Sequence, residues 1–144
     1  MKFKLFGILV LTGVTIQFIP YGKDHMNPPI VGEPQWNNPR TKELFSRVCA
    51  NCHSNTTTWP WYSNVAPVSW LIQYDVDGGR KRFNVSMWNV QKKNKGYDAA
   101  EEVGAGEMPP WQYVIGHPEA KLTESERTEF VQGLTATFGS EKGK

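Results

Sequence analysis

Residues 47–63 read RVCANCHSNTTTWPWYS, and this stretch contains both cysteines of the 144-residue chain. Cys49 and Cys52 are three positions apart, and His53 follows directly. Two of the six tryptophans of the chain come a few residues later. Two thiols beside an imidazole, followed by large aromatic rings, restrict this segment to a few kinds of site.

Four interpretations of the cysteine pair compete: a thiol redox pair, a zinc site, a short-range disulfide and covalent haem attachment. A thioredoxin-like redox pair needs a βαβ setting, and the chain has no alternating strand pattern. A zinc site needs four ligands, usually as two closely spaced pairs, and only His25 and His117 remain as further histidines. A simple disulfide would leave the adjacent histidine without a role.

Haem attachment uses every residue of the C-x-x-C-H pattern. Two thiols three positions apart lie on the same side of a helical turn, where each can add to one vinyl group of a porphyrin. The imidazole of His53 can then bind the iron as the proximal ligand. The motif therefore predicts one haem c, held by thioether bonds from Cys49 and Cys52.

Large aromatic side chains follow the motif, and a porphyrin offers them a flat apolar surface. We expect four of them to line the haem pocket: Trp59, Trp61, Tyr62 and Trp70. The alternative for each ring is that it packs against the others beneath a loop.

The sixth iron ligand is expected from the segment GEMPPWQY, residues 106–113. Two prolines stiffen the backbone there and can hold the thioether of Met108 in a defined place. His117 is the alternative ligand. Met87 fits a helical stripe better and is expected to pack in the core.

The first 21 residues have the pattern of an export element, with Lys2 and Lys4 before an apolar segment over residues 5–20. No small-residue cleavage site ends that segment. We therefore expect an uncleaved transmembrane signal anchor over residues 1–21, with a cleaved signal and a soluble periplasmic protein as the alternative. Either way the domain is expected in the periplasm, in the first case on the inner membrane.

The remaining sequence predicts a tether, one all-α domain and a short tail. Residues 22–40 contain four prolines and predict an extended tether, residues 41–139 the haem-binding domain, and residues 140–144 the tail. Helical spacing predicts a helix capped by Thr41 that leads into Cys49.

Three further helical stretches follow in the domain. The first begins at about Pro67, and Gly78 and Gly79 can weaken or break it. Residues 80–97 extend or restart that helix, with Phe83, Met87 and Val90 as its stripe. The last helix follows a capping box formed by Thr123 and Glu126.

The formal charge of +2 argues against a nucleic-acid partner. Asp75 and Asp77 lack the remaining ligands of a calcium loop. Basic groups at residues 80–82 and 92–95 either dock an acidic redox partner or form a solvated face. Arg80 or Arg82 could instead pair with a haem propionate.

Four segments resemble the bacterial haem-binding domain family, whose members are short, exported, often membrane-anchored proteins similar to c-type cytochromes: CANCHSNTTTWPWYSNVAPVSWLI, DVDGGRKRFNVSMW, GEMPPWQY and HPEAKLTESER. They span about residues 36–138. The resemblance implies that Cys49 and Cys52 carry the haem, that His53 is its proximal ligand and that Met108 is its distal ligand.

Similarity to class I cytochromes further implies a cytochrome c-like fold around the haem. In that fold the helix before the cysteines packs against the last helix, which would bring Phe45 against Phe130 and Leu134. The long tryptophan-rich insert after the motif departs from simple cytochromes.

The sequence thus predicts a monohaem c-type cytochrome that transfers single electrons between periplasmic or membrane redox proteins and is not an enzyme. One alternative is a five-coordinate haem c module that binds or senses a gas. A peroxidase is the weaker alternative, because His117 is the only visible candidate for a distal base.

Overall fold

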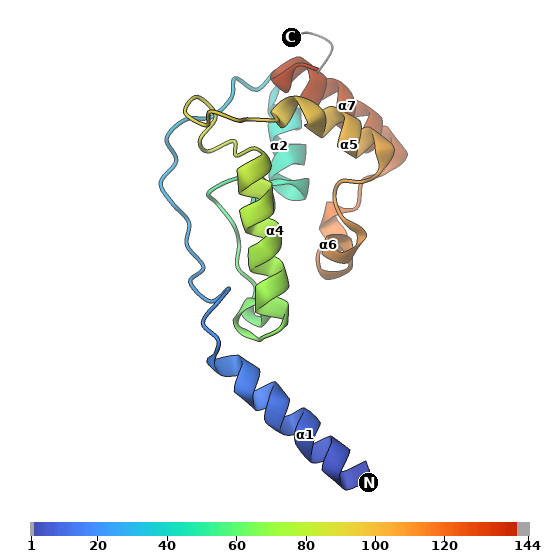
Figure 1. Cartoon of the computed structure of the whole chain (residues 1–144). Helices are drawn as coiled ribbons and strands as arrows, with labels where there is room; N and C mark the ends of the chain where they lie inside the picture. Colours follow the sequence, from blue (N-terminus) through green and yellow to red (C-terminus); the bar gives the residue numbers. More distant parts are fainter. Residues whose placement is uncertain (1, 141–144) are drawn as a thin grey trace.

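Helices provide the regular structure in residues 2–140, the part of the chain that the computed structural model describes (Figure 1). The described residues contain no strand, only an isolated bridge between Gly32 and Met87. The α-helices are α1 (Lys2–Thr15), α2 (Pro39–Val48), α3 (Ala50–His53), α4 (Val68–Arg82), α5 (Ala99–Ala105), α6 (Trp111–Gly116) and α7 (Glu124–Phe138). Short 3-10 helices are η1 (Ile16–Phe18), η2 (Trp61–Asn64), η3 (Gly96–Asp98) and η4 (Pro118–Ala120). The prediction of an all-α protein is confirmed.

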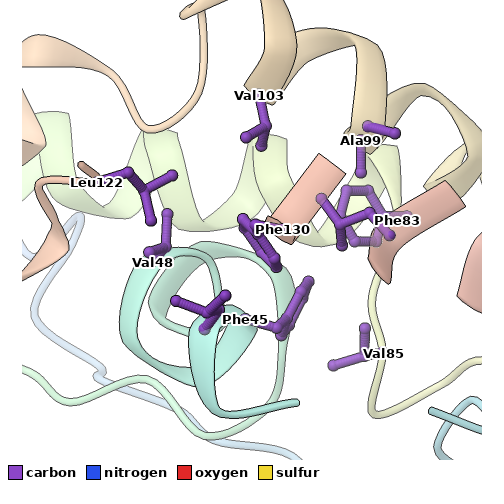
Figure 2. Packing of buried hydrophobic residues seen from close by; sticks show 11 residues of the cluster. Phe45, Val48, Phe83, Val85, Ala99, Val103, Leu122 and Phe130 are labelled. Atoms are coloured by element: carbon purple, nitrogen blue, oxygen red, sulfur yellow. The ribbon is translucent and has the colours of Figure 1, made fainter. Parts of the chain in front are cut away.

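The core lies where α2, α5 and α7 meet. Phe45 of α2 and Phe130 of α7 are almost fully buried at its centre, and Val103 of α5 faces them (Figure 2). Leu134 belongs to the same cluster. The expected packing of the helix before the cysteines against the last helix is therefore present, and it fixes the end of α2 from which the cysteine motif begins.

Helix α2 begins earlier than the sequence predicted. Its N-cap is Asn38, whose side-chain Oδ1 accepts a hydrogen bond from the Thr41 backbone N–H at 2.8 Å, and Pro39 occupies the first turn. The expectation that Thr41 caps this helix is wrong. Thr41 is instead buried against Gly133 of α7. A Cβ atom added to Gly133 would lie 2.1 Å from Thr41 Oγ1.

Helix α4 continues through Gly78 and Gly79 to Arg82, so these glycines do not break it. Beyond Arg82 the chain becomes extended at Phe83, and no α-helix forms over residues 83–95. The predicted stripe is therefore wrong: Phe83 is buried, whereas Val90 is 51% exposed. Long-range hydrogen bonds hold this loop, among them Val85 N–H to the His53 carbonyl at 2.9 Å.

Helix α7 begins as predicted. The Thr123 Oγ1 accepts a hydrogen bond from the Glu126 backbone N–H, and the Glu126 carboxylate accepts one from the Thr123 backbone N–H. This reciprocal arrangement is a capping box. Phe130 and Leu134 then point into the core, so the local signal and the tertiary packing agree.

The proline-rich segment 22–40 is mostly irregular, as expected, but it is attached to the domain along its length. Asn55 Nδ2 donates to the Pro29 carbonyl at 2.9 Å, and the backbone N–H groups of Val31 and Gly32 both donate to the Ser86 carbonyl. Trp36 packs against the core cluster. The segment is therefore a strap on the domain surface rather than a free tether.

Arg80 of α4 fixes the first part of this strap. Its guanidinium donates to the Met26 carbonyl and to Asn27 Oδ1, and also to the Ser54 carbonyl and Thr57 Oγ1. One side chain thus joins the strap, α4 and the loop after the cysteine motif.

The N-terminal helix α1 extends away from the domain and has no buried residue (Figure 1). It is a regular α-helix for 14 residues only, and in the described part of the chain we find no helix with both the length and the apolar character needed to cross a membrane. The signal anchor expected over residues 1–21 stays a prediction. Met1 and residues 141–144, which hold most of the predicted tail, lie outside the described residues.

Candidate functional site

A cleft of about 400 Å³ opens between the cysteine motif, α4, the end of α5 and the start of α6. Cys49, Cys52 and His53 line it together with Met108, which lies 55 positions after the histidine. All four predicted attachment and iron-binding residues therefore share one cleft. The tertiary structure brings them together from two separate segments.

The cysteine motif is held in a helical turn. Cys49 ends α2, and the backbone N–H groups of Cys52 and His53 both donate to its carbonyl, at 3.1 Å and 2.9 Å. Helix α4 packs closely against this turn. A Cβ atom added to Gly79 would lie only 2.4 Å from the Cys52 carbonyl oxygen. The same glycine that is expected to weaken the helix is thus what allows this close approach.

Both cysteines are free thiols in the structure. Burial raises the pKa of Cys49, and burial together with the charge of Asp75 raises the pKa of Cys52 to about 11, against a smaller opposing effect of Arg80. Redox-active cysteine pairs instead have a thiol pKa below the ordinary value. This cleft favours protonated thiols, which argues against a thioredoxin-like pair.

His53 is 8% exposed, and its ring stacks on Phe83 with the centroids 4.1 Å apart. Its Nδ1 lies 3.2 Å from the Phe83 carbonyl oxygen. Burial lowers the pKa of His53, although the backbone carbonyls of Phe83 and Gly79 act in the opposite direction. A neutral imidazole whose Nδ1 donates to a carbonyl keeps Nε2 as the coordinating atom, as in other metal-binding histidines.

Met108 is positioned by the end of α5. Gly106 takes a left-handed conformation with φ 79° and closes the helix, and the Met108 backbone N–H donates to the Glu102 carbonyl at 3.1 Å. Arg127 of α7 donates to the Val103 carbonyl at 2.6 Å and ties this helix end to the core. The thioether therefore sits on a fixed turn.

Several cleft residues were missed by sequence reasoning. Tyr74 and Tyr113 line the cleft as its aromatic side chains, with Phe83 beside His53. The Tyr113 hydroxyl accepts a hydrogen bond from Asn51 at 2.7 Å, and burial raises the pKa of Tyr113 to about 12. Tyr113 ends the segment GEMPPWQY, so its position five residues after Met108 was the available signal.

The four aromatic residues expected in the pocket are not among those lining the cleft. Trp59 stacks on His25 with the centroids 4.7 Å apart, and Tyr62 lies edge-on to Trp61, which is 79% exposed. Trp70 is partly buried in α4. These residues form part of the opposite, N-terminal end of α4 and the loop before it.

The alternative sixth ligand, His117, also lies outside the cleft lining. Its ring stacks on Tyr113 at 4.1 Å, and its Nδ1 lies 3.2 Å from the Tyr113 carbonyl oxygen. Its contacts are thus those of a residue that supports a cleft wall. Among the described residues there is also no group of three or more His, Cys, Asp or Glu side chains placed to bind a metal ion, so the zinc interpretation gains no support.

The chemistry of the cleft fits a haem c. It combines two thiols, a neutral imidazole and a thioether in a mainly apolar lining. The charged side chains of the lining are the cations Arg82 and Lys95 and the carboxylates Asp75, Asp98 and Glu102. Arg82 forms an ion pair with Asp98 and lies 3.8 Å from Glu102. Such a donor set suits a flat apolar ring that carries acidic substituents on one edge.

Comparison with known proteins gives one match. No curated protein and no solved structure matches the chain. The family model for the haem-binding domain matches residues 11–136, which is most of the sequence and includes the whole cleft. The chain therefore belongs to the haem-binding domain family.

Proposed function

We propose that the protein is a monohaem c-type cytochrome that carries single electrons between redox proteins of the periplasm or its membrane. Cys49 and Cys52 would hold the haem through thioether bonds, and His53 and Met108 would bind its iron. The observation that carries this proposal is the presence of Met108 in the same cleft as the C-x-x-C-H motif. A bound haem c supplies reversible one-electron chemistry at its iron.

The residues around the motif support this role by holding the ligands in place. The Phe83 carbonyl orients the His53 ring, and the turn after α5 holds Met108. Two protein ligands leave no open position for oxygen or peroxide, which suits a carrier rather than an enzyme. A histidine and methionine pair also favours a higher reduction potential than two histidines.

The two cations of the cleft lining bear on the orientation of the haem, although Asp75, Asp98 and Glu102 also line the cleft. Arg82 and Lys95 face the cleft, whereas the guanidinium of Arg80 already donates to four acceptors outside the cleft lining. Of the two arginines considered from the sequence, Arg82 is thus the one that pairs with a haem propionate. Arg82 is also paired with Asp98, so it would share its guanidinium between that carboxylate and the propionate.

The proposed location follows from the N-terminal segment. Lys2 and Lys4 lie in the first turn of α1, ahead of its apolar residues, and no residue of α1 is buried, which supports export and retention on the periplasmic side of a membrane. The partners would then be periplasmic or membrane-bound redox proteins. The measured mass of the mature protein reports both the attached haem and the true start of the chain.

The test is the absorption spectrum of the mature protein and of two methionine variants. We expect the wild type to be low-spin in both oxidation states and unable to bind carbon monoxide when reduced. Met108→Ala should become high-spin and bind carbon monoxide. Met26→Ala, which removes a 68% exposed thioether from the strap, should behave as the wild type.

Two results would contradict this assignment. A colourless protein with two alkylatable thiols would remove the haem itself. A wild-type protein that is already high-spin and binds carbon monoxide would point to the five-coordinate gas-binding module, and turnover of peroxide would point to a peroxidase.

A further inference from the structure

The N-terminal end of α4 carries an exposed apolar surface next to the end of the N-terminal helix. It consists of Trp61, Val65, Val68 and Leu71, of which Trp61 is 79% and Leu71 63% exposed. We call these four residues the apolar foot. Exposed apolar side chains that gather in one place are found where a membrane or a partner covers a surface.

The end of the N-terminal segment is fixed against the apolar foot by hydrogen bonds. Gln17 Nε2 donates to the Ala66 carbonyl at 2.9 Å, and the Ala66 backbone N–H donates to Gln17 Oε1 at 3.0 Å. Gly22, with φ 77°, packs so closely on α4 that a Cβ atom there would lie 2.4 Å from the Ser69 carbonyl oxygen. Helix α1 therefore leaves the domain near the N-terminal end of α4, as Figure 1 shows.

Few charged residues lie at this junction, although the Lys23 ammonium donates to the Gln17 carbonyl. No Lys, Arg, Asp or Glu occurs in residues 5–22 or in residues 53–74. The basic residues of the domain gather at the far end of α4 and in the loop after it, at residues 80–82 and 92–95. The polarity of the molecule thus changes along α4, from uncharged beside α1 to basic at its C-terminus.

We propose that the apolar foot rests on the lipid bilayer into which α1 inserts, so that the domain stands on the membrane in one orientation. This inference rests on the membrane location proposed above. Beyond Lys2 and Lys4, helix α1 is mainly apolar and none of its residues is buried, which favours lipid as the phase around it. Tryptophan is one of the side chains enriched at the membrane–water interface.

This orientation sets the distance between the haem cleft and the bilayer surface. Val68 belongs to the foot, and Gly78 of the same helix lines the cleft. Ten residues of helix correspond to about 15 Å. The strap holds this geometry, because it is bonded to the domain rather than free. The cleft is therefore presented close to the bilayer, within reach of a membrane-embedded redox partner.

The experiment uses the full-length holoprotein in nanodiscs of phosphatidylcholine, a lipid without net charge. Hydrogen exchange is measured by mass spectrometry on peptides that cover residues 60–66. In nanodiscs, these peptides should exchange several-fold more slowly in the wild-type protein than in the Leu71→Glu variant. Trp61→Ser provides a second, independent variant of the foot. Val90→Glu is the matched control, because Val90 is similarly exposed but lies in the loop near the basic end.

The outcomes distinguish lipid contact of the apolar foot from membrane insertion of the α1 anchor. If the protein co-purifies with nanodiscs and residues 60–66 exchange equally fast in the wild type and both foot variants, the foot does not touch lipid and only the anchor stands. If the protein does not associate with nanodiscs at all, the anchor and the foot are both wrong. The haem spectrum, recorded on the same samples, reports independently on the cytochrome assignment.

Discussion

Gly79 of α4 lies against the backbone of Cys52, where a Cβ atom would be 2.4 Å from the Cys52 carbonyl oxygen and 2.9 Å from its Cβ. This contact lets α4 pass directly behind the turn that carries both cysteines and the histidine. A Cβ atom at the adjacent Gly78 would have no neighbouring atom within 4 Å, although Gly78 also lines the cleft. Two neighbouring glycines thus have different roles.

Replacement of Gly79 by alanine should therefore disturb the attachment site. The added methyl group cannot be accommodated without moving α4 away from the cysteine turn, which should lower the free energy of unfolding by about 1–3 kcal/mol. The yield of attached haem per protein should fall as well. Urea unfolding and the ratio of haem to protein absorbance measure these two effects.

Gly78→Ala is the control for this prediction. Its methyl group meets open space, so helix propensity alone should leave the stability unchanged or raise it by up to about 1 kcal/mol. Equal stability of the two variants in urea would show that the Gly79 contact is unimportant.

Gly133→Ala should destabilise the packing of α2 on α7. The new Cβ would lie 2.1 Å from Thr41 Oγ1 and 2.9 Å from its Cγ2, and Thr41 is buried, so its side chain cannot simply turn away. We expect a loss of about 1–3 kcal/mol in urea unfolding. The double variant with Thr41→Ala should recover part of that loss, because it removes the clashing atoms.

Gly104→Ala serves as the matched helix glycine for that experiment. Its Cβ would lie 3.7 Å from Val131 Cγ2, an ordinary contact. This variant should be as stable as the wild type or slightly more stable. A loss at position 104 as large as that at position 133 would contradict the steric explanation.

Arg80→Lys should release the strap. A lysine keeps the charge but cannot reproduce the fork of bonds to Met26, Asn27, Ser54 and Thr57. Hydrogen exchange in residues 23–30 should become faster, while exchange in α7 stays unchanged. Lys81→Ala, an exposed neighbour, should leave the strap as it is; unchanged exchange in Arg80→Lys would mean that the remaining strap contacts suffice.

The capping box should make stability depend on acid pH. Hydrogen bonding to the Thr123 backbone, and then to Arg47, lowers the pKa of Glu126 below its ordinary value of about 4.3. The stabilising effect is therefore fully present above that ordinary value and is lost as the pH falls through the lowered pKa of the folded protein. Between those pH values the wild type should lose stability faster than Glu126→Gln.

Urea midpoints at several pH values from about 3 to 7 test this expectation. Glu124→Gln removes a charge from the same first turn and is the control. Parallel pH curves for the wild type and Glu126→Gln would show that this carboxylate does not contribute to acid unfolding.

Local features of the sequence determined much of this protein. The C-x-x-C-H spacing indicated a helical turn with two thiols and an imidazole, and the Thr123 and Glu126 pair marked the start of α7. Both depend on residues three or four positions apart, so they can be read without knowledge of the fold. The haem-binding family was also recognisable at this level.

The tertiary structure decided which distant residues complete the cleft. Tyr74 and Tyr113 line it, while Trp59 and Trp61 do not, because the direction in which the aromatic loop leaves the motif depends on long-range bonds such as Asn55 to Pro29. The attachment of the strap to the domain likewise depends on long-range hydrogen bonds. Proline content predicts an irregular chain but not the Arg80 bonds that hold it to the domain.

The two glycines of α4 show the physical basis of this division. Intrinsic propensity predicts that Gly78 and Gly79 weaken a helix, because glycine gives up more backbone freedom than alanine when it becomes helical. The cost is offset at Gly79 by close packing against Cys52, a contact across 27 positions that no local pattern contains. The sequence by itself therefore determined the chemistry of the attachment motif, and only the folded chain decided what surrounds it.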